Sequence, residues 1–156
     1  MIKSKLGWNG KFIFKIKNLI TGEIKTEIIE NRIMDDILDE LVSVLDAGST
    51  DLEIKYLAVG TGNTAVTDGD TELDTEFFRI IPSISPVLSD TGEITTEFTL
   101  IDTDGNCQIE EVGIFVGSTA SAAADSGKLL SRILWSHEKT SSEEITLIRI
   151  DTISRV

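Results

Sequence analysis

Residues 93–116 read EITTEFTLIDTDGNCQIEEVGIFV, and this stretch decides how the fold is interpreted. Its first half alternates in the period-two pattern of a half-buried strand, with one face formed by Ile94, Thr96, Phe98 and Leu100. Asp104-Gly105 follows, and both residues tolerate the positive φ angles of a two-residue hairpin turn. The sequence therefore predicts that strands 93–103 and 106–116 pair directly.

Working outward, the rest of the chain also has the character of strands. Residues 11–17 and 23–29 form a predicted β-hairpin around a turn at 18–22. Further strands are expected at residues 53–59, 77–88, 128–135 and 143–156. Pro82 and Pro86 cannot donate to a ladder, so 77–88 is predicted to be an edge strand.

The last strand, residues 143–156, has apolar residues on both of its faces. Its apolar positions shift from Ile145 and Leu147 to Ile148 and Ile150. Such a shift indicates either a bulge or a strand covered on both sides. We favour the second interpretation, with part of the cover supplied by another subunit.

One helix is expected between the hairpin and the remaining strands. Residues 31–48 place acids in the first helical turn and an apolar stripe on one face. The stripe consists of Ile33, Ile37, Leu41 and Leu45, with Met34, Leu38 and Val42 beside it. Gly48 is a suitable stop signal. Eight strands and one helix predict a mainly β protein, an antiparallel β-sandwich with one N-terminal accessory helix. We expect a single domain over 1–156, with 1–50 as a hairpin-and-helix lead-in and 51–156 as the sandwich core.

Composition excludes several classes of function. Apolar residues make up 40% of the chain, but no run approaches the roughly 20 residues that span a bilayer, so we expect a folded, soluble protein without a membrane partner. The N-terminus does not resemble a secretory signal, which predicts synthesis in the cytoplasm. Cys107 and His137 are the only residues of their types, which excludes an intramolecular disulfide and multi-cysteine zinc sites.

The charge is strongly acidic but unevenly distributed. The net charge is −13, made up of +4 in residues 1–32 and −17 in residues 33–156. Such a protein repels nucleic acid, which binds through clustered Lys and Arg. Lys11, Lys15 and Lys17 are either the solvated face of the hairpin or an interface for an acidic neighbour, including another copy. Trp8, ahead of the first strand, is a candidate partner contact.

Residues 56–79, YLAVGTGNTAVTDGDTELDTEFFR, combine three glycines with closely spaced acids. The third glycine of a dinucleotide fingerprint is missing, and acids would repel a phosphate, so phosphate binding is not expected. Asp68, Asp70 and Asp74 are oxygen ligands of the kind calcium prefers, but their spacing misses the EF-hand pattern. We predict no metal or other cofactor here, and interpret the loop as a surface for a neighbouring protein.

Candidate catalytic residues are few. His137 lies in a polar connection, and neither Ser136 nor Ser141 is surrounded by a nucleophile-elbow motif. Cys107 is interpreted as a small core residue. With nine aromatic residues, the chain lacks the platforms of a glycosidase cleft. We do not expect an enzyme.

The order of several motifs resembles a known family. VGTGN (59–63), TELDTEFFR (71–79), IEEVGIF (109–115), LLSR (129–132) and then Lys139 are similar to the sequence plan of tail-collar fibre modules and related tail or baseplate proteins of bacteriophages. The resemblance implies a virion structural protein, made in the host bacterial cytoplasm and built into the tail. It also implies an oligomer, a trimer or ring, whose partners are its own copies and other tail proteins, and it implies no catalytic residue.

Such collar modules commonly precede a long fibre shaft, whereas here the sequence ends at Val156. That difference favours an adaptor, baseplate or neck component over a receptor-binding fibre. Glu76 and Arg79 are expected to form a local ion pair at the exit of the acidic loop. The alternative function is a calcium-dependent carbohydrate- or surface-binding β-sandwich.

Overall fold

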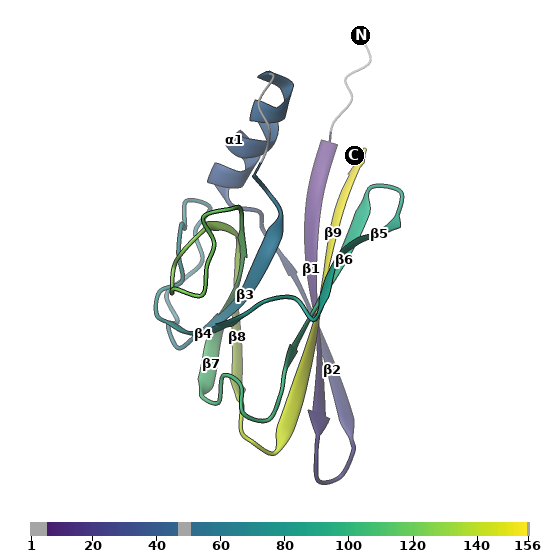
Figure 1. The fold of residues 1–156 in the computed structure, drawn as a ribbon, viewed down its shortest axis with the longest axis vertical. Helices are drawn as coiled ribbons and strands as arrows, with labels where there is room; N and C mark the ends of the chain where they lie inside the picture. The colour runs from purple at the N-terminus through teal and green to yellow at the C-terminus, as the bar shows by residue number, and fades with distance from the viewer. Residues whose placement is uncertain (1–5, 47–50, 156) are drawn as a thin grey trace.

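Two antiparallel sheets and one short helix make up the computed structural model, which describes residues 6–46 and 51–155 (Figure 1). The five-stranded sheet has the order β2-β1-β9-β6-β5, formed by Ile24–Asn31, Leu6–Asn18, Glu143–Arg155, Glu93–Leu100 and Ile84–Asp90. The four-stranded sheet has the order β4-β3-β7-β8, formed by Glu76–Ile80, Ile54–Gly60, Gln108–Val116 and Lys128–Glu138. The predicted class, a mainly β sandwich of antiparallel sheets with one helix, is confirmed.

The predicted hairpin between 93–103 and 106–116 is wrong. β6 pairs with β5 and β9 in one sheet, whereas β7 pairs with β3 and β8 in the other. Gly105 does adopt a positive φ of 59°, but Asp104 does not, and the hydrogen-bonded turn lies earlier, where the Asp104 N–H donates to the Ile101 carbonyl at 3.1 Å. This turn belongs to a connection that crosses from one sheet to the other. A turn signal of this kind specifies a local reversal of the chain and not the partner of each strand.

The predicted edge strand 77–88 is two strands instead of one. The chain leaves the four-stranded sheet after β4, passes Pro82, and enters the five-stranded sheet as β5. Both strands lie at sheet edges, as expected for a segment whose prolines cannot donate to a ladder. This division explains why the described residues form nine strands where eight were expected.

The N-terminal hairpin is part of the sandwich and not a lead-in to it. β1 pairs with β9 along 13 residues, and its inward side chains Phe12, Phe14 and Ile16 are buried in the core. Phe14 stacks on Trp135 of the opposite sheet with a ring-centroid distance of 3.9 Å. The boundary expected at residue 50 therefore does not separate the hairpin from the core.

β9 runs without a register shift between β1 and β6, so the bulge that the sequence left open does not occur. Its inward face begins with buried Ile145 and Leu147 and continues with the buried ion pair of Arg149 and Asp151, whose closest atoms are 2.6 Å apart. Ile148 lies on the outward face and is half-buried. One face of β9 is therefore covered by the core, and the other is not covered by the described chain.

The helix α1 (Asp35–Ser43) is shorter than expected, and a 3-10 turn (Val44–Asp46) follows it. Gly48, the expected stop, lies outside the described residues. The predicted packing face is only partly buried: Ile33, Met34 and Ile37 join the core, whereas Leu45 is 89% exposed. In the described parts of the chain, no helix has the length and apolar character that crossing a membrane requires.

Candidate functional site: two loops fixed by buried ion pairs

A buried carboxylate organises the acidic loop between β3 and β4. Glu111 of β7 is fully buried, and its Oε1 accepts hydrogen bonds from the backbone N–H groups of Gly62 at 3.2 Å and Thr75 at 2.7 Å. Its Oε2 accepts from the N–H of Asp74 at 3.0 Å. Both ends of the loop are thus tied to one side chain, which sets the shape of residues 61–75.

Arg132 of β8 compensates the buried charge of Glu111. Its Nε donates to Glu111 at 2.7 Å and its NH1 group to Asp70 at 2.8 Å, while NH2 donates to the Thr64 carbonyl at 3.1 Å. Burial raises the pKa of Asp70, but hydrogen bonds from Thr67 and Arg132 outweigh it and lower that pKa. A buried charge pair of this kind is tolerated only when its remaining hydrogen-bonding groups are satisfied, as they are here.

The glycines of VGTGN have a steric explanation. A Cβ atom on Gly60 would lie 2.5 Å from the Thr75 carbonyl oxygen and 2.6 Å from Glu111 Oε1. A Cβ on Gly62 would lie 2.4 Å from the Cβ of Asp74. Only glycine allows the two ends of the loop to approach each other and Glu111 this closely, so the glycines serve the loop itself.

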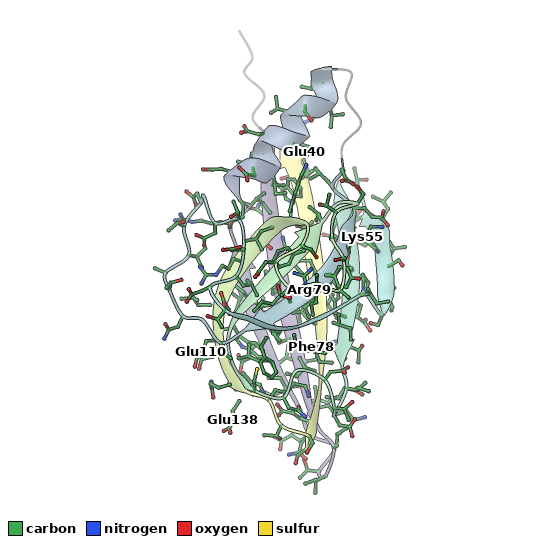
Figure 2. All side chains as sticks on the ribbon, turned by 60° about the vertical axis from the view of Figure 1, so that its left-hand side comes forward. Glu40, Lys55, Phe78, Arg79, Glu110 and Glu138 are labelled. Carbon is green, nitrogen blue, oxygen red and sulfur yellow. The ribbon has the colours of Figure 1, made fainter. Side chains whose placement is uncertain are left out.

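A second buried ion pair fixes the loop at residues 117–127. Arg79 and Glu76 of β4 form the predicted pair with two hydrogen bonds of 2.6 and 2.7 Å, and their side chains are only 4% and 2% exposed. Arg79 also donates to the carbonyl oxygens of Ser121 and Ser126 at 2.9 and 3.0 Å. Figure 2 shows Arg79 over the middle of the four-stranded sheet. The loop therefore has a defined shape, and it is tied to Arg79, whose guanidinium lies over the ring of Phe115 in the same sheet at 4.5 Å from the ring centroid.

Lys139 fixes the connection between β6 and β7. Its side chain is buried, and Nζ donates to the Ile101 carbonyl at 2.8 Å and to the Asn106 side chain at 2.9 Å. Burial lowers the pKa of Lys139 because the charged form loses hydration. The lysine of the family resemblance thus supports the crossing between the two sheets.

The interface candidates from the sequence do not form one surface. Lys11, Lys15 and Lys17 lie on the face of β1 that points away from the core. Trp8 lies on the opposite face, is half-buried against the core, and donates from Nε1 to Asp151 at 3.1 Å. Trp8 instead borders an apolar cavity of about 330 Å³ between the sheets, with Leu41, Leu52, Leu88, Ile94 and Ile153.

The three loop aspartates also point in different directions. Asp68 forms an exposed ion pair with Arg32 at 2.9 Å, and Asp70 is held by Arg132 and Thr67. Asp74 is exposed and takes part through its backbone. Within residues 6–46 and 51–155, no group of three or more potential metal-ligating side chains is assembled. The geometry gives the calcium hypothesis no support.

His137 and Cys107, which were considered for catalysis, both pack against other residues of the protein. The ring of His137 stacks on Trp135 at a centroid distance of 5.0 Å, and its Nε2 contacts Glu143 at 2.5 Å. Burial raises the pKa of the Cys107 thiol, which disfavours its reactive thiolate form.

Sequence reasoning missed the central roles of Glu111 and Arg132. A signal was present, because each is a charged residue inside an apolar strand, in IEEVGIF and LLSRILW. Charged residues are almost never fully buried unless they are paired. Burial therefore predicts that each charge has a partner, and the pairing of β7 with β8 is what makes Glu111 and Arg132 partners of each other.

We compared the chain with protein-family models, with curated proteins and with solved structures, and none of the three comparisons found a match.

Proposed function

We propose that this protein is a structural component of a bacteriophage tail. It acts through protein–protein contacts as an adaptor, baseplate or neck component, or as a fibre-attachment module. Its partners are other copies of itself and other tail proteins, and its site of action is the virion. The protein is not an enzyme in this proposal.

The proposal rests on one observation, which is the structural role of the residues in the motifs that carry the resemblance. Gly60 and Gly62 allow the two ends of the first loop to approach each other closely. Glu111 accepts hydrogen bonds from the backbone of this loop, and Arg132 pairs with Glu111. The other motif residues fix the second loop and the crossing between the sheets. The residues that support the resemblance therefore shape the surface, as a protein built for fixed contacts requires.

Fixed loops favour binding for a thermodynamic reason. A loop that is ordered before association loses less conformational entropy when it binds a partner. Two loops of this protein are held by buried charges instead of by surface contacts alone. This preorganisation favours a role in assembly, where the same contact is formed many times.

The test is coexpression of the chain with the products of the genes that flank it, followed by size-exclusion chromatography with light scattering. We expect flanking tail-tube, tape-measure or portal genes, a stable complex with at least one tail protein, and the chain in purified particles by mass spectrometry. Absence from particles, together with no complex with any flanking product, would contradict the proposal.

A loop variant makes the test specific. Glu72 is exposed in the first loop, so Glu72→Arg changes the charge of the proposed surface without touching the buried network. Glu138→Arg, at an exposed position on β8, is the matched control. We expect the loop variant to weaken the complex at least tenfold and the control to leave it unchanged. Equal binding by both variants would remove the loop from the interface.

A further inference from the structure

Strand β2 lies at one edge of the five-stranded sheet, and its other side is open for pairing. Within residues 6–46 and 51–155, β1 is the only strand that pairs with β2, and the register has no shift. The Asn18 N–H donates to the Glu23 carbonyl at 2.9 Å, so the backbone groups of odd-numbered β2 residues face β1. The N–H and C=O groups of the even-numbered residues, from Ile24 to Glu30, therefore point away from the sheet. In Figure 1 the lower part of β2 has only β1 beside it.

The other three edges of the two sheets are less suited to pairing with a further strand. β5 contains Pro86 and register shifts, and β4 is only five residues long. The Leu130 carbonyl of β8 already accepts a hydrogen bond from the Met34 N–H at 3.1 Å. β2 has eight residues, no proline and no bulge, and its Ile24 and Ile28 are 58% and 61% exposed. A long, regular and apolar edge of this kind is a template for another strand.

The charges of β2 decide which strand fits. Lys25 and Glu27 lie on the inward face, where they form an ion pair, and Glu27 also accepts from Trp135 of the opposite sheet. Inward-facing charges discourage edge pairing unless the partner strand sets opposite charges against them. Because Lys25 and Glu27 are two positions apart, a second β2 strand that runs antiparallel carries the required charges itself.

One register of β2 against β2 of a second copy satisfies these charges. The outward backbone groups require even-numbered residues to face each other. A two-fold axis at a residue between Thr26 and Ile29 keeps at least five residues of β2 in the ladder. An axis at Glu27 sets this glutamate against itself, and an axis at Ile28 or Ile29 brings no opposite charges together. An axis at Thr26 sets Lys25 of each copy against Glu27 of the other.

The same register also matches the apolar residues. With the axis at Thr26, Ile24 of each copy lies opposite Ile28 of the other, on the outward face. These pairs and the pair of Thr26 with itself are the hydrogen-bonded pairs of the ladder, and each exchanges two backbone hydrogen bonds. On the inward face, the two ion pairs of Lys25 and Glu27 become a group of four alternating charges.

The charge of the hairpin favours a second copy as the partner. Residues 11–31 contain four lysines and three glutamates, a net charge of +1, so the rest of the chain carries −14 of the total of −13. Two copies that meet through β2 bring their nearly neutral hairpins together. A contact through other parts of the chain would oppose like charges, which repel.

We infer that β2 pairs with β2 of a second copy, antiparallel and around a two-fold axis at Thr26. The two five-stranded sheets then form one continuous sheet across the dimer. The inference goes beyond the proposed function, which requires that copies associate but does not define the contact. A two-fold contact uses the same surface on both copies and closes as a dimer.

Cysteine cross-linking tests the register. With the axis at Thr26, the Cα atoms of the two Thr26 residues are about 5.5 Å apart, within the range of a disulfide. The two Ile28 residues are then about 13 Å apart along the strands, too far for a disulfide. We expect Thr26→Cys to form a disulfide-linked dimer with oxidised glutathione and Ile28→Cys to form none, although both positions are exposed. The wild-type chain, with Cys107 as its only cysteine, gives the background.

Proline variants test the hydrogen bonds. Thr26→Pro removes an N–H that faces away from β1, so the ladder with β1 is kept while the contact loses its central pair. Glu30→Pro removes an outward N–H beyond the paired residues and is the matched control. Sedimentation equilibrium is expected to show a wild-type dimer, at least tenfold weaker association of Thr26→Pro, and unchanged association of Glu30→Pro. Circular dichroism shows whether each variant is folded, and if Thr26→Pro is not, the cysteine variants decide.

Several results would overturn the inference. These are a wild-type chain that stays monomeric at millimolar concentration, a Thr26→Cys variant that cross-links no more than Ile28→Cys, and a folded Thr26→Pro variant that associates like the wild type. A monomeric chain whose Thr26→Pro variant loses its complex with a tail protein would also overturn it, because the edge would then pair with a strand of that protein.

Failure of this contact and failure of the tail role give different results. A dimer through β2 in a chain that forms no complex with tail proteins and is absent from particles would keep the contact and remove the tail role. A complex with a tail protein that is formed without the dimer would remove the contact and leave the tail role standing.

Discussion

Replacing Glu111 with glutamine removes one charge and one acceptor atom from the centre of the first loop's support. The side chain keeps its size, but one of its two oxygens becomes an NH₂ group that faces N–H donors. Glutamine in one orientation opposes Arg132 and the Asp74 amide, and in the other it opposes the amides of Gly62 and Thr75. Neither orientation satisfies all four donors.

The expected loss in the free energy of unfolding follows from the burial of the ion pair between Glu111 and Arg132. Breaking a buried ion pair by removing one partner costs about 3–5 kcal/mol, and Arg132 retains Asp70 after the change, so we expect about 3 kcal/mol for Glu111→Gln. For a domain of this size, that loss lowers the melting temperature by roughly 6–12 °C. Glu110→Gln is the matched control, because Glu110 lies next in sequence but near the surface (Figure 2). It should change stability by less than about 0.5 kcal/mol.

Urea unfolding at pH 7 measures the free energy, and amide hydrogen exchange tests the location of the effect. Protection should fall most at the amides of Gly62, Asp74 and Thr75, since these donate to Glu111. The double variant Glu111→Met with Arg132→Met should not recover wild-type stability, because those amides still lack an acceptor. A loss below about 1 kcal/mol for Glu111→Gln, or unchanged exchange at these amides, would refute the reasoning.

Three further predictions concern the loops and are checked by urea unfolding. Arg79→Lys keeps the charge but loses the two-point pairing with Glu76, so it should lower the free energy of unfolding by about 2 kcal/mol and speed proteolysis within residues 117–127. The control Arg32→Lys changes an exposed ion pair and should lower it by less than about 0.5 kcal/mol. Equal effects would contradict this. Gly60→Ala should cost about 1–3 kcal/mol, and Gly69→Ala, where a Cβ meets nothing within 4 Å, should be nearly neutral; a neutral Gly60→Ala would disprove the steric explanation. Because the folded-state pKa of Asp70 is lowered, its contribution is complete well above about pH 3.9 and is lost as pH falls through the folded-state value. Asp70→Asn should therefore be less stable at pH 7 and lose less stability on acidification, and parallel pH profiles would argue against this role.

The strands and the helix were largely predictable from the sequence, because alternation and helical periodicity are properties of a few consecutive residues. In residues 11–17 the apolar Phe12, Phe14 and Ile16 alternate with Lys11, Ile13, Lys15 and Lys17, and the structure buries the face of β1 that carries the first three. The pair of Glu76 and Arg79 was expected from their closeness in sequence. Residues three apart in a regular strand point to opposite faces, and the register shift in β4 opposite Val59 and Gly60 is what brings these two to one face. Its burial was not, because the cover comes from a loop more than 40 residues later in the chain.

Strand pairing and the loop supports were not predictable in the same way. The sequence Asp104-Gly105 is compatible with a hairpin and with a crossing between the sheets. The crossing is stabilised by Lys139, which comes from a distant segment of the chain. Glu111 and Arg132 are 21 residues apart and meet only because β7 and β8 pair. Long-range partners of this kind depend on the assembled sheets.

The central claim is that the fixed surface of this protein serves assembly with tail proteins. The most direct measurement is sedimentation velocity of the purified chain, alone and mixed with the products of its flanking genes, over a range of concentrations. The account predicts species larger than the monomer that become more abundant with concentration, and a defined complex with a tail protein. A chain that sediments as a monomer in every mixture would contradict it.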